Sequence, residues 1–295
     1  MNKYLDMILD NRFFLAREIY FQLDNISWPK NAQEPDYVAS LVKELPKILT
    51  EAMNGVYGKK IKTGGCFIHQ KPIVHFINKP GFKDPELGDL LIICREKRYS
   101  GYVYNAIILQ AKRVANPNHV YIPNDHQYVL YSEWPEFEYK RAGYLNGKTR
   151  SILPKTITQG AQYLLIEGHE AVELLTATVD RPLQASNCFA GTLTSLMLFE
   201  SGRTFQISNP HDDWSQMILD LLRMSVSSYY TRKGIGHTGI RRWNGDASFD
   251  FICNLDNQQY AEDETEHELY DNDNARSGMS LICVDLGESF LERQD

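Results

Sequence analysis

Four polar side chains border two apolar stretches in the first half of the chain, and their types suit the hydrolysis of phosphodiesters. Glu86 and Asp89 precede the run 90–94, and Gln110 and Lys112 follow a second apolar run. Carboxylate and amide oxygens are ligands that Mg²⁺ prefers. A bound Mg²⁺ polarises a phosphate and lowers the pKa of a water molecule. A neighbouring lysine can orient that water or neutralise the charge that develops on the phosphate.

The two apolar runs must bring these side chains together. Each run is short, rich in β-branched residues and bounded by turn residues, which predicts two buried strands. Residues 97–101 suit a hairpin connection between them. Gln110 and Lys112 are two positions apart and therefore share a face of their strand. Because a hairpin places the start of its first strand beside the end of its second, Asp89 is expected near both, with Glu86 at the same edge.

This pattern resembles the PD-(D/E)XK nuclease superfamily, whose fold is called restriction-endonuclease-like, over roughly residues 40–170. Asp89 matches the aspartate that opens one strand, and Lys112 matches the lysine of the next. Gln110 stands where the family usually has Asp or Glu, although some branches carry Gln-x-Lys. The resemblance implies catalytic roles for Asp89, Gln110, Lys112 and Glu86. It also implies a Mg²⁺ or Mn²⁺ ion held by Asp89, Gln110 and the backbone carbonyl of Ala111.

The function that the resemblance implies is metal-dependent cleavage of DNA. By analogy with the superfamily, it also suggests a prokaryotic antiphage defence effector with a protein partner, and a homo-oligomer is compatible with it. A non-catalytic interaction subunit with a degenerate nuclease fold is the alternative, because Gln110 removes one negative charge from the site. A structural reading also stays open: Asp89 as a turn residue, and Lys112 with Arg113 as the solvated end of a strand.

The expected fold class is α/β, with a mixed central sheet flanked by helices and a restriction-endonuclease-like core. The expected division is a helical N-terminal addition (1–34), the nuclease-like core (35–180) and a C-terminal elaboration packed on the core (181–295). Helical spacing of apolar residues predicts amphipathic helices. The segments with this spacing are 3–24, 35–54 and 212–229.

Shorter elements complete the expected fold. Pro46 should kink or divide the helix 35–54. In the superfamily, a helix before the first core strand often supplies a further glutamate. Glu44 and Glu51 are candidates for that role, and exposed surface residues are the alternative. The remaining expectations are a first core strand at 66–76, helices at 125–131 and 158–166, strands or buried helix at 173–179 and 192–199, and a closing strand at 280–285.

The composition is that of an ordinary globular protein of the cytoplasm. The chain has 295 residues, of which 43% are hydrophobic and 23% charged. It contains no run of 18 apolar residues, so no membrane span is expected. The N-terminus does not have the pattern of a signal peptide. The five cysteines are scattered without a Cys-x-x-Cys motif, which favours free thiols in a reducing compartment.

The net charge of −7 comes from one segment of the chain. Residues 255–274 contain eight Asp or Glu and no Lys or Arg, so the rest of the chain is close to neutral. Such a block usually forms a solvated loop, and an electrostatic mimic of nucleic acid is the alternative.

Basic residues elsewhere could contact phosphates. The candidates are Lys140, Arg141, Arg232, Lys233, Arg241 and Arg242, with Lys148 and Arg150 beside the first pair. Aromatic residues between 128 and 139 are expected in the core, and stacking on unpaired bases is the alternative.

Overall fold

The computed structural model describes residues 3–67, 72–120, 126–168, 171–180, 183–226, 229–232, 236–239 and 279–288. The helices are α1 (Lys3–Asp24), α2 (Glu34–Tyr57), α3 (His126–Glu133), α4 (Phe189–Met197) and α5 (Asp213–Val226), with a 3₁₀ turn at Gly143–Leu145. The acidic segment 255–274 and the basic residues Lys233, Arg241 and Arg242 lie outside the described residues.

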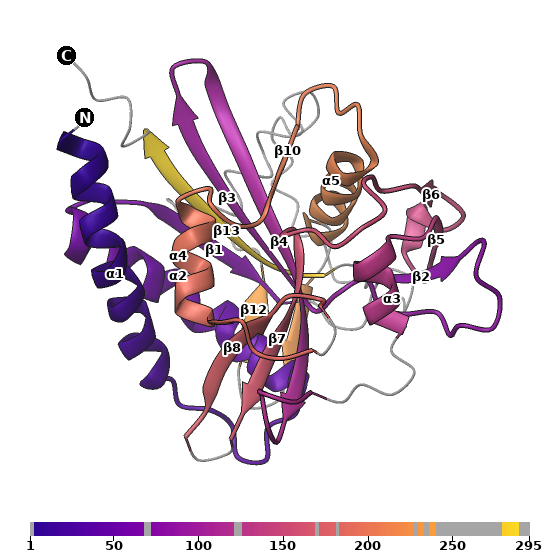
Figure 1. Ribbon diagram of the computed structural model, residues 1–295, viewed down its shortest axis with the longest axis horizontal. Coiled ribbons are helices and arrows are strands. Elements are labelled where there is room, and N and C mark those ends of the chain that lie inside the picture. The colour runs from indigo at the N-terminus through magenta and orange to yellow at the C-terminus, as the bar shows by residue number, and fades with distance from the viewer. Residues whose placement is uncertain are drawn as a thin grey trace.

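A mixed central sheet of eight strands forms the middle of the protein (Figure 1). Seven strands follow the order β1-β13-β3-β4-β7-β8-β9, and β10 pairs with β4. The strands are β1 (Lys62–Cys66), β3 (Leu90–Arg98), β4 (Gly101–Val114), β7 (Ala161–Glu167), β8 (Glu173–Ala177), β9 (Asn187–Cys188), β10 (Arg203–Phe205) and β13 (Ser280–Glu288). The α/β class with a mixed sheet flanked by helices is thus confirmed.

Two smaller groups of strands accompany the main sheet. One contains β2 (Ile73–Phe76), β5 (Phe137–Lys140) and β6 (Thr149–Arg150), and the other pairs β11 (Tyr229–Arg232) with β12 (Gly236–Gly239).

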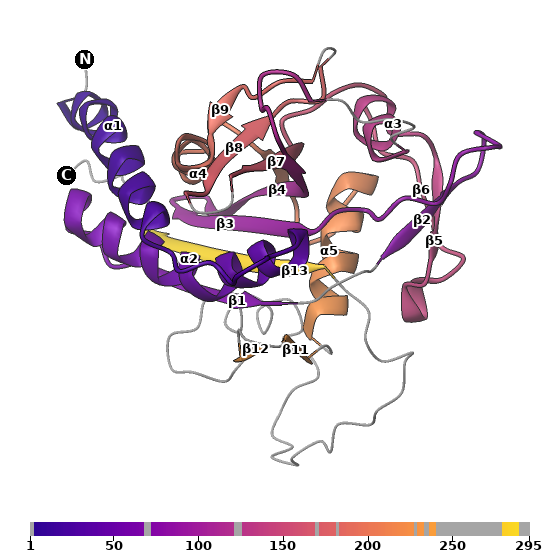
Figure 2. The ribbon, with the colours of Figure 1, turned by 90° about the horizontal axis from the view of Figure 1, so that it is seen from below.

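Helices and strands cover both faces of the main sheet, which explains the unbroken apolar runs of its central strands. One face packs against α1, α2 and α4. The other packs against α3, α5 and the β2–β5–β6 sheet. Figures 1 and 2 show the first set of helices grouped on one side and α3 and α5 on the other. Residues 90–94 of β3 are all buried and alternate between these two cores.

The aromatic residues of α3 and of the segment after it belong to the core. Tyr131, Trp134, Phe137 and Tyr139 are fully buried, and the Trp134 ring meets the Trp214 ring edge-on at 5.9 Å. The structural reading of this cluster therefore holds for these four residues, since buried rings cannot stack on the bases of a nucleic acid.

The segment 158–166, expected to be helical, is a strand instead. β7 begins at Ala161 and pairs with β4 in parallel and β8 in antiparallel fashion. Its first six residues are all buried, because neighbours cover both of its faces. An apolar run of this length fits a central strand and a buried helix equally well, so periodicity alone does not separate them.

Three other expected elements differ in extent. The expected strand 66–76 contains parts of two strands, β1 and β2, which belong to different sheets. α2 continues through Pro46 to Tyr57 as one helix, so Pro46 does not divide it. The segment 192–199, expected to be a strand or a buried helix, belongs mostly to helix α4, which begins earlier, at Phe189.

The C-terminal strand does not lie at the periphery. β13 lies between β1 and β3, antiparallel to the first and parallel to the second. Its residues 280–285 are buried, and its Asp285 carboxylate pairs with Arg95 of β3. The last described segment of the chain therefore forms an interior strand of the sheet, and the boundary expected at residue 181 cuts through one sheet.

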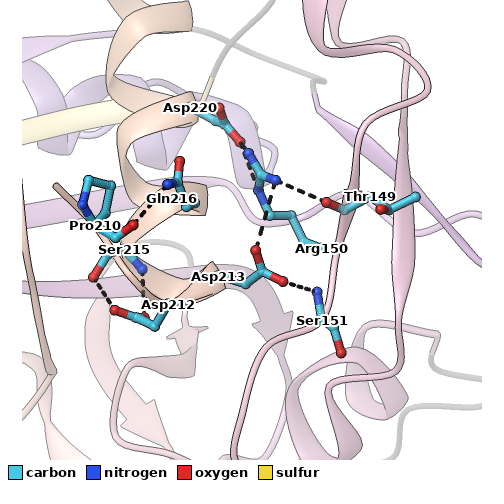
Figure 3. A network of polar contacts seen from close by, with 9 residues as sticks. All are labelled: Thr149, Arg150, Ser151, Pro210, Asp212, Asp213, Ser215, Gln216 and Asp220. Carbon is cyan, nitrogen blue, oxygen red and sulfur yellow. Dashed lines mark hydrogen bonds and ion pairs between the residues drawn. The ribbon is translucent and has the colours of Figure 1, made fainter.

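A network of charged side chains fastens α5 to β6 (Figure 3). Arg150 donates to the Asp220 carboxylate through its Nε, at 3.0 Å, and its guanidinium also approaches Asp213 at 3.9 Å. Asp213 in turn accepts from the backbone N–H of Ser151 at 2.7 Å. Arg150 is largely buried and already paired, so its observed role is to hold α5 in place rather than to contact phosphate.

Candidate metal site at the end of strand β4

The backbone before β3 places Asp89 against β4. The Asp89 N–H donates to the Leu109 carbonyl at 2.9 Å, and the Tyr131 hydroxyl donates to the Leu87 carbonyl at 2.7 Å. Gly88 lies between them, and a Cβ at this position would come within 2.5 Å of the Ile108 side chain. Only glycine allows the backbone at position 88 to come this close to β4. The close approach places the Asp89 carboxylate at the edge of the sheet.

Two carboxylates lie along the part of β4 that extends beyond β3. Leu90 at the start of β3 pairs with Leu109, whereas β4 continues to Val114. The Ala111 N–H donates to Asp89 Oδ2 at 2.8 Å, and the Arg113 N–H donates to Glu34 Oε1 at 2.9 Å. Glu34 is the first residue of α2. Asp89 and Glu34 therefore bind successive N–H groups on the same side of β4.

The Ala111 carbonyl lies between these two carboxylates. The Ile108 N–H donates to Gly160 on the β7 side, and the Leu109 carbonyl accepts from Asp89 on the β3 side. Because the N–H and C=O of one strand residue point to the same side, Ala111 directs its carbonyl toward the side of Asp89 and Glu34. The Ala111 carbonyl and the two carboxylates together provide hard oxygen ligands for a metal ion.

Gln110 takes part in a chain of amide hydrogen bonds rather than facing open space. The Gln127 Nε2 donates to Gln110 Oε1 at 2.6 Å, and the Gln110 Nε2 donates to Asp89 Oδ2. Because a carboxylate accepts hydrogen bonds, the Gln110 amide presents its NH₂ group to Asp89 and its oxygen to Gln127. Gln110 is buried, and in this arrangement it orients the Asp89 carboxylate.

The carboxylates of the site influence one another. Burial, followed by the charge of Glu86, raises the pKa of Asp89 to about 7, although the Ala111 N–H and the Lys112 ammonium favour its ionised form. Burial also raises the pKa of Glu86, with Lys112 opposing and Glu34 reinforcing the rise. Glu34, Glu86, Asp89 and Lys112 therefore form one electrostatic group, in which a cation would relieve the mutual repulsion of the acids.

Lys112 extends from β4 on the same face as Gln110, because the two residues are two positions apart. Its side chain is half-buried, and its ammonium group lies close enough to Glu86 and Asp89 to favour the ionised form of both carboxyl groups. The ammonium is thus placed to interact with a ligand that binds beside the carboxylates.

The residues fit an ion that takes hard oxygen ligands and retains water. Within the described ranges, no three His, Cys, Asp or Glu side chains converge closely enough to hold a metal by themselves. Mg²⁺ is commonly bound through one or two carboxylates, with water and substrate phosphates completing its ligands. Asp89, the Ala111 carbonyl and Glu34 match that requirement.

The helix glutamate of this site is Glu34, and sequence reasoning did not identify it. Glu44 and Glu51, the candidates from the sequence, form ion pairs with Lys43 and Lys47 of their own helix, at 3.4 and 3.7 Å. Glu34 precedes Pro35, a combination typical of a helix start. That local signal locates the start of the helix, but it does not indicate the strand against which the helix packs. Gln127 was also missed, since nothing in the sequence relates α3 to Gln110.

The expected phosphate-binding residues do not gather at the site in the described structure. Lys140 pairs with Glu138 at 2.6 Å on β5, a strand of the small sheet. Arg141 follows it with a positive φ of 47° and is exposed. Arg232 ends β11, which pairs with β12. The other three candidates lie outside the described residues.

A hollow of about 420 Å³ opens beside the end of β4. Arg113, Val114, Ala115, Glu167 and Gly168 line it. A second hollow, of about 540 Å³, lies next to the other end of β4, where Tyr104, Phe205 and Asp212 are among its lining residues. The first lies toward the end of β7, on the other side of β4 from Asp89, and none of the candidate-site residues lines either hollow.

Comparisons with protein-family models, with curated proteins and with solved structures found no match to this chain. None of the helices in the described ranges combines the length and apolar character needed to cross a bilayer. Cys66, Cys94, Cys188 and Cys283 form no disulfide with one another, and Cys253 lies outside the described residues. The functional conclusion therefore depends on the geometry of the site.

Replacing Asp89 by asparagine should stabilise the metal-free protein at pH 8. The folded-state pKa of about 7 lies above the ordinary value of 3.8, so wild-type stability falls as pH rises from about 4 to about 7. Asparagine removes that loss while it can still accept from the Ala111 N–H. Urea unfolding in a chelator should show a gain on the order of 1–3 kcal/mol at pH 8 and a smaller gain at pH 5. A variant no more stable than wild type at pH 8 would show that burial and the charge of Glu86 do not destabilise the ionised Asp89 carboxylate.

Proposed function

We propose that the protein is a metal-dependent nuclease with a restriction-endonuclease-like core, and that DNA is its substrate. The proposal depends on the arrangement of polar groups at the end of β4. Asp89 and Glu34 bind successive N–H groups there, on the side toward which the Ala111 carbonyl is directed, and Lys112 follows. By analogy with the superfamily alone, we also propose that the protein is cytoplasmic and acts in defence together with a protein partner.

The side chains have separate roles in the proposed reaction. Asp89, Glu34 and the Ala111 carbonyl would hold the ion, and Gln110 with Gln127 keeps the Asp89 carboxylate in its orientation. When bound, Mg²⁺ would polarise the phosphate and lower the pKa of the attacking water. The Lys112 ammonium stabilises charge on the phosphate or orients that water. Glu86, whose pKa is raised by burial, can accept a proton from the attacking water.

Cleavage assays test the proposal directly. Supercoiled plasmid, single-stranded DNA and single-stranded RNA are each incubated with the protein and Mg²⁺, Mn²⁺ or a chelator. The proposal predicts divalent-dependent conversion of at least the plasmid, and its failure on every substrate with either metal would contradict it. Cleavage of RNA alone would support the assignment as a nuclease and change the proposed substrate from DNA to RNA.

One observation favours the alternative, a non-catalytic subunit with a degenerate nuclease fold. Gln110 turns its NH₂ group toward Asp89, and its oxygen already accepts from Gln127. In that case the protein should bind nucleic acid or a protein partner without cleaving it.

Replacing Gln110 by glutamate separates the two functions. The new carboxylate would lie against Asp89 in a buried position, so the metal-free protein should lose about 1–3 kcal/mol of stability at pH 8. If an ion binds there, Mg²⁺ should raise the melting temperature of the variant more than that of wild type. An equal response of the two proteins to Mg²⁺ would favour the degenerate subunit.

A further inference from the structure

Helix α1 presents a row of exposed aromatic side chains on its outer face. Phe13, Phe14, Tyr20 and Phe21 are 68%, 50%, 42% and 52% exposed. The opposite face of the helix packs into the core, where Leu15, Ile19 and Leu23 are buried against α2 and α4. Scattered apolar residues on a surface are ordinary, but a contiguous aromatic patch usually marks an interaction site.

Arg17 lies at the centre of this patch. At about 100° per residue, positions 13, 14, 17, 20 and 21 fall within roughly 120° of the helix circumference, and position 17 lies in the middle. The Arg17 guanidinium lies 5.9 Å from the centre of the Phe14 ring and 5.8 Å from that of Phe21. Phe13 lies against Phe14 and Tyr20 against Phe21, with ring centres 6.1 and 6.2 Å apart. The arginine and the four rings therefore form one continuous surface, which we call the α1 patch.

The spacing of the patch reads almost the same in both directions. Two aromatic residues precede Arg17 by four and three positions, and two follow it by three and four. In an antiparallel helix pair with a two-fold axis at Arg17, Phe13 meets Phe21 of the second copy and Phe14 meets Tyr20. Such self-complementarity is what an interface between identical subunits requires.

We propose that the α1 patch is a homodimer interface in which α1 packs antiparallel against α1 of a second copy. The four aromatic side chains expose roughly 400 Å² per copy, because an aromatic side chain has about 200 Å² to bury. A stable interface buries about 800 Å² per partner, so the flanks of α1 must contribute the rest and the dimer should be of moderate affinity.

The charge at the centre of the patch sets its salt dependence. A two-fold axis at Arg17 brings the Arg17 guanidinium groups of the two copies toward each other. Their repulsion is screened by salt, while the aromatic contacts are not. Dimerisation should therefore become stronger as the salt concentration rises.

Sedimentation of the full chain over a range of concentrations tests the interface. Wild type should form a dimer, and the double variant Phe14→Ser/Phe21→Ser should raise its dissociation constant at least about 100-fold. Tyr99→Ser is the matched control, since Tyr99 is 98% exposed at the tip of the β3–β4 hairpin and should leave dimerisation unchanged. Circular dichroism of each variant checks that the fold is retained.

Cysteine cross-linking tests the antiparallel register, in a background with Cys188 and Cys253 replaced by serine. A mixture of Phe13→Cys and Phe21→Cys proteins should form the mixed disulfide, whereas each protein alone should cross-link far less. A parallel pair gives the reverse pattern and contradicts the proposal. Wild type that stays monomeric well above micromolar concentration, or that binds lipid vesicles through the patch as a monomer, overturns it.

Discussion

Replacing Lys112 by alanine should reduce DNA cleavage at least about 100-fold while the protein stays folded. Lys112 is half-buried at the end of β4 and follows the Ala111 carbonyl directly. Loss of its ammonium group removes the positive charge beside the proposed metal, but it removes no packed core side chain. Initial rates of plasmid cleavage, with circular dichroism to verify folding, measure the effect.

Variants at other positions make the result interpretable. Asp89→Ala should abolish both metal binding and cleavage, because it removes the carboxylate held by Ala111 and Gln110. Lys140→Ala is the matched control, since Lys140 pairs with Glu138 in the small sheet and should affect cleavage little. Full activity in both Lys112→Ala and Asp89→Ala would exclude a catalytic site at the end of β4.

Replacing Asp285 by alanine should cost about 3–5 kcal/mol of stability, because it leaves the buried Arg95 guanidinium without its carboxylate. Arg95 and Asp285 join β3 to β13 with an N···O distance of 2.8 Å, and their side chains are 5% and 10% exposed. Urea unfolding measures the loss. The double variant Arg95→Met/Asp285→Leu should recover most of it, since two apolar side chains leave no buried charge.

The same pair of strands provides a control. Lys97 and Glu288 lie 3.9 Å apart and are mostly exposed, so Glu288→Ala should change stability by less than about 0.5 kcal/mol. Equal losses in Asp285→Ala and Glu288→Ala would mean that burial of the first pair does not determine its contribution.

The hairpin could be predicted from sequence because its signals are local. The apolar runs of β3 and β4 are bounded by turn residues, and pairing of Leu90 with Leu109 follows from the short connection at Tyr99 and Ser100. Once that pairing exists, Asp89 must lie near Gln110 and Ala111. The prediction that Asp89 lies beside Gln110 and Ala111 therefore needed few assumptions.

Long-range placement was not accessible in the same way. Glu34 reaches Arg113 across 79 positions, and β13 inserts beside β3 from the far end of the chain. Neither contact leaves a periodic signal, because each depends on how separately formed elements pack. The strand β7 was mistaken for a helix for a related reason: burial on both faces removes the alternation that marks a strand.

A crystal grown or soaked with Mn²⁺ tests the central claim most directly, through the anomalous signal of the metal. We expect a peak about 2.0–2.3 Å from an Asp89 carboxylate oxygen and from the Ala111 carbonyl oxygen, with Glu34 contributing directly or through water. Strong Mn²⁺ peaks elsewhere on the protein, with none at the end of β4, would contradict it.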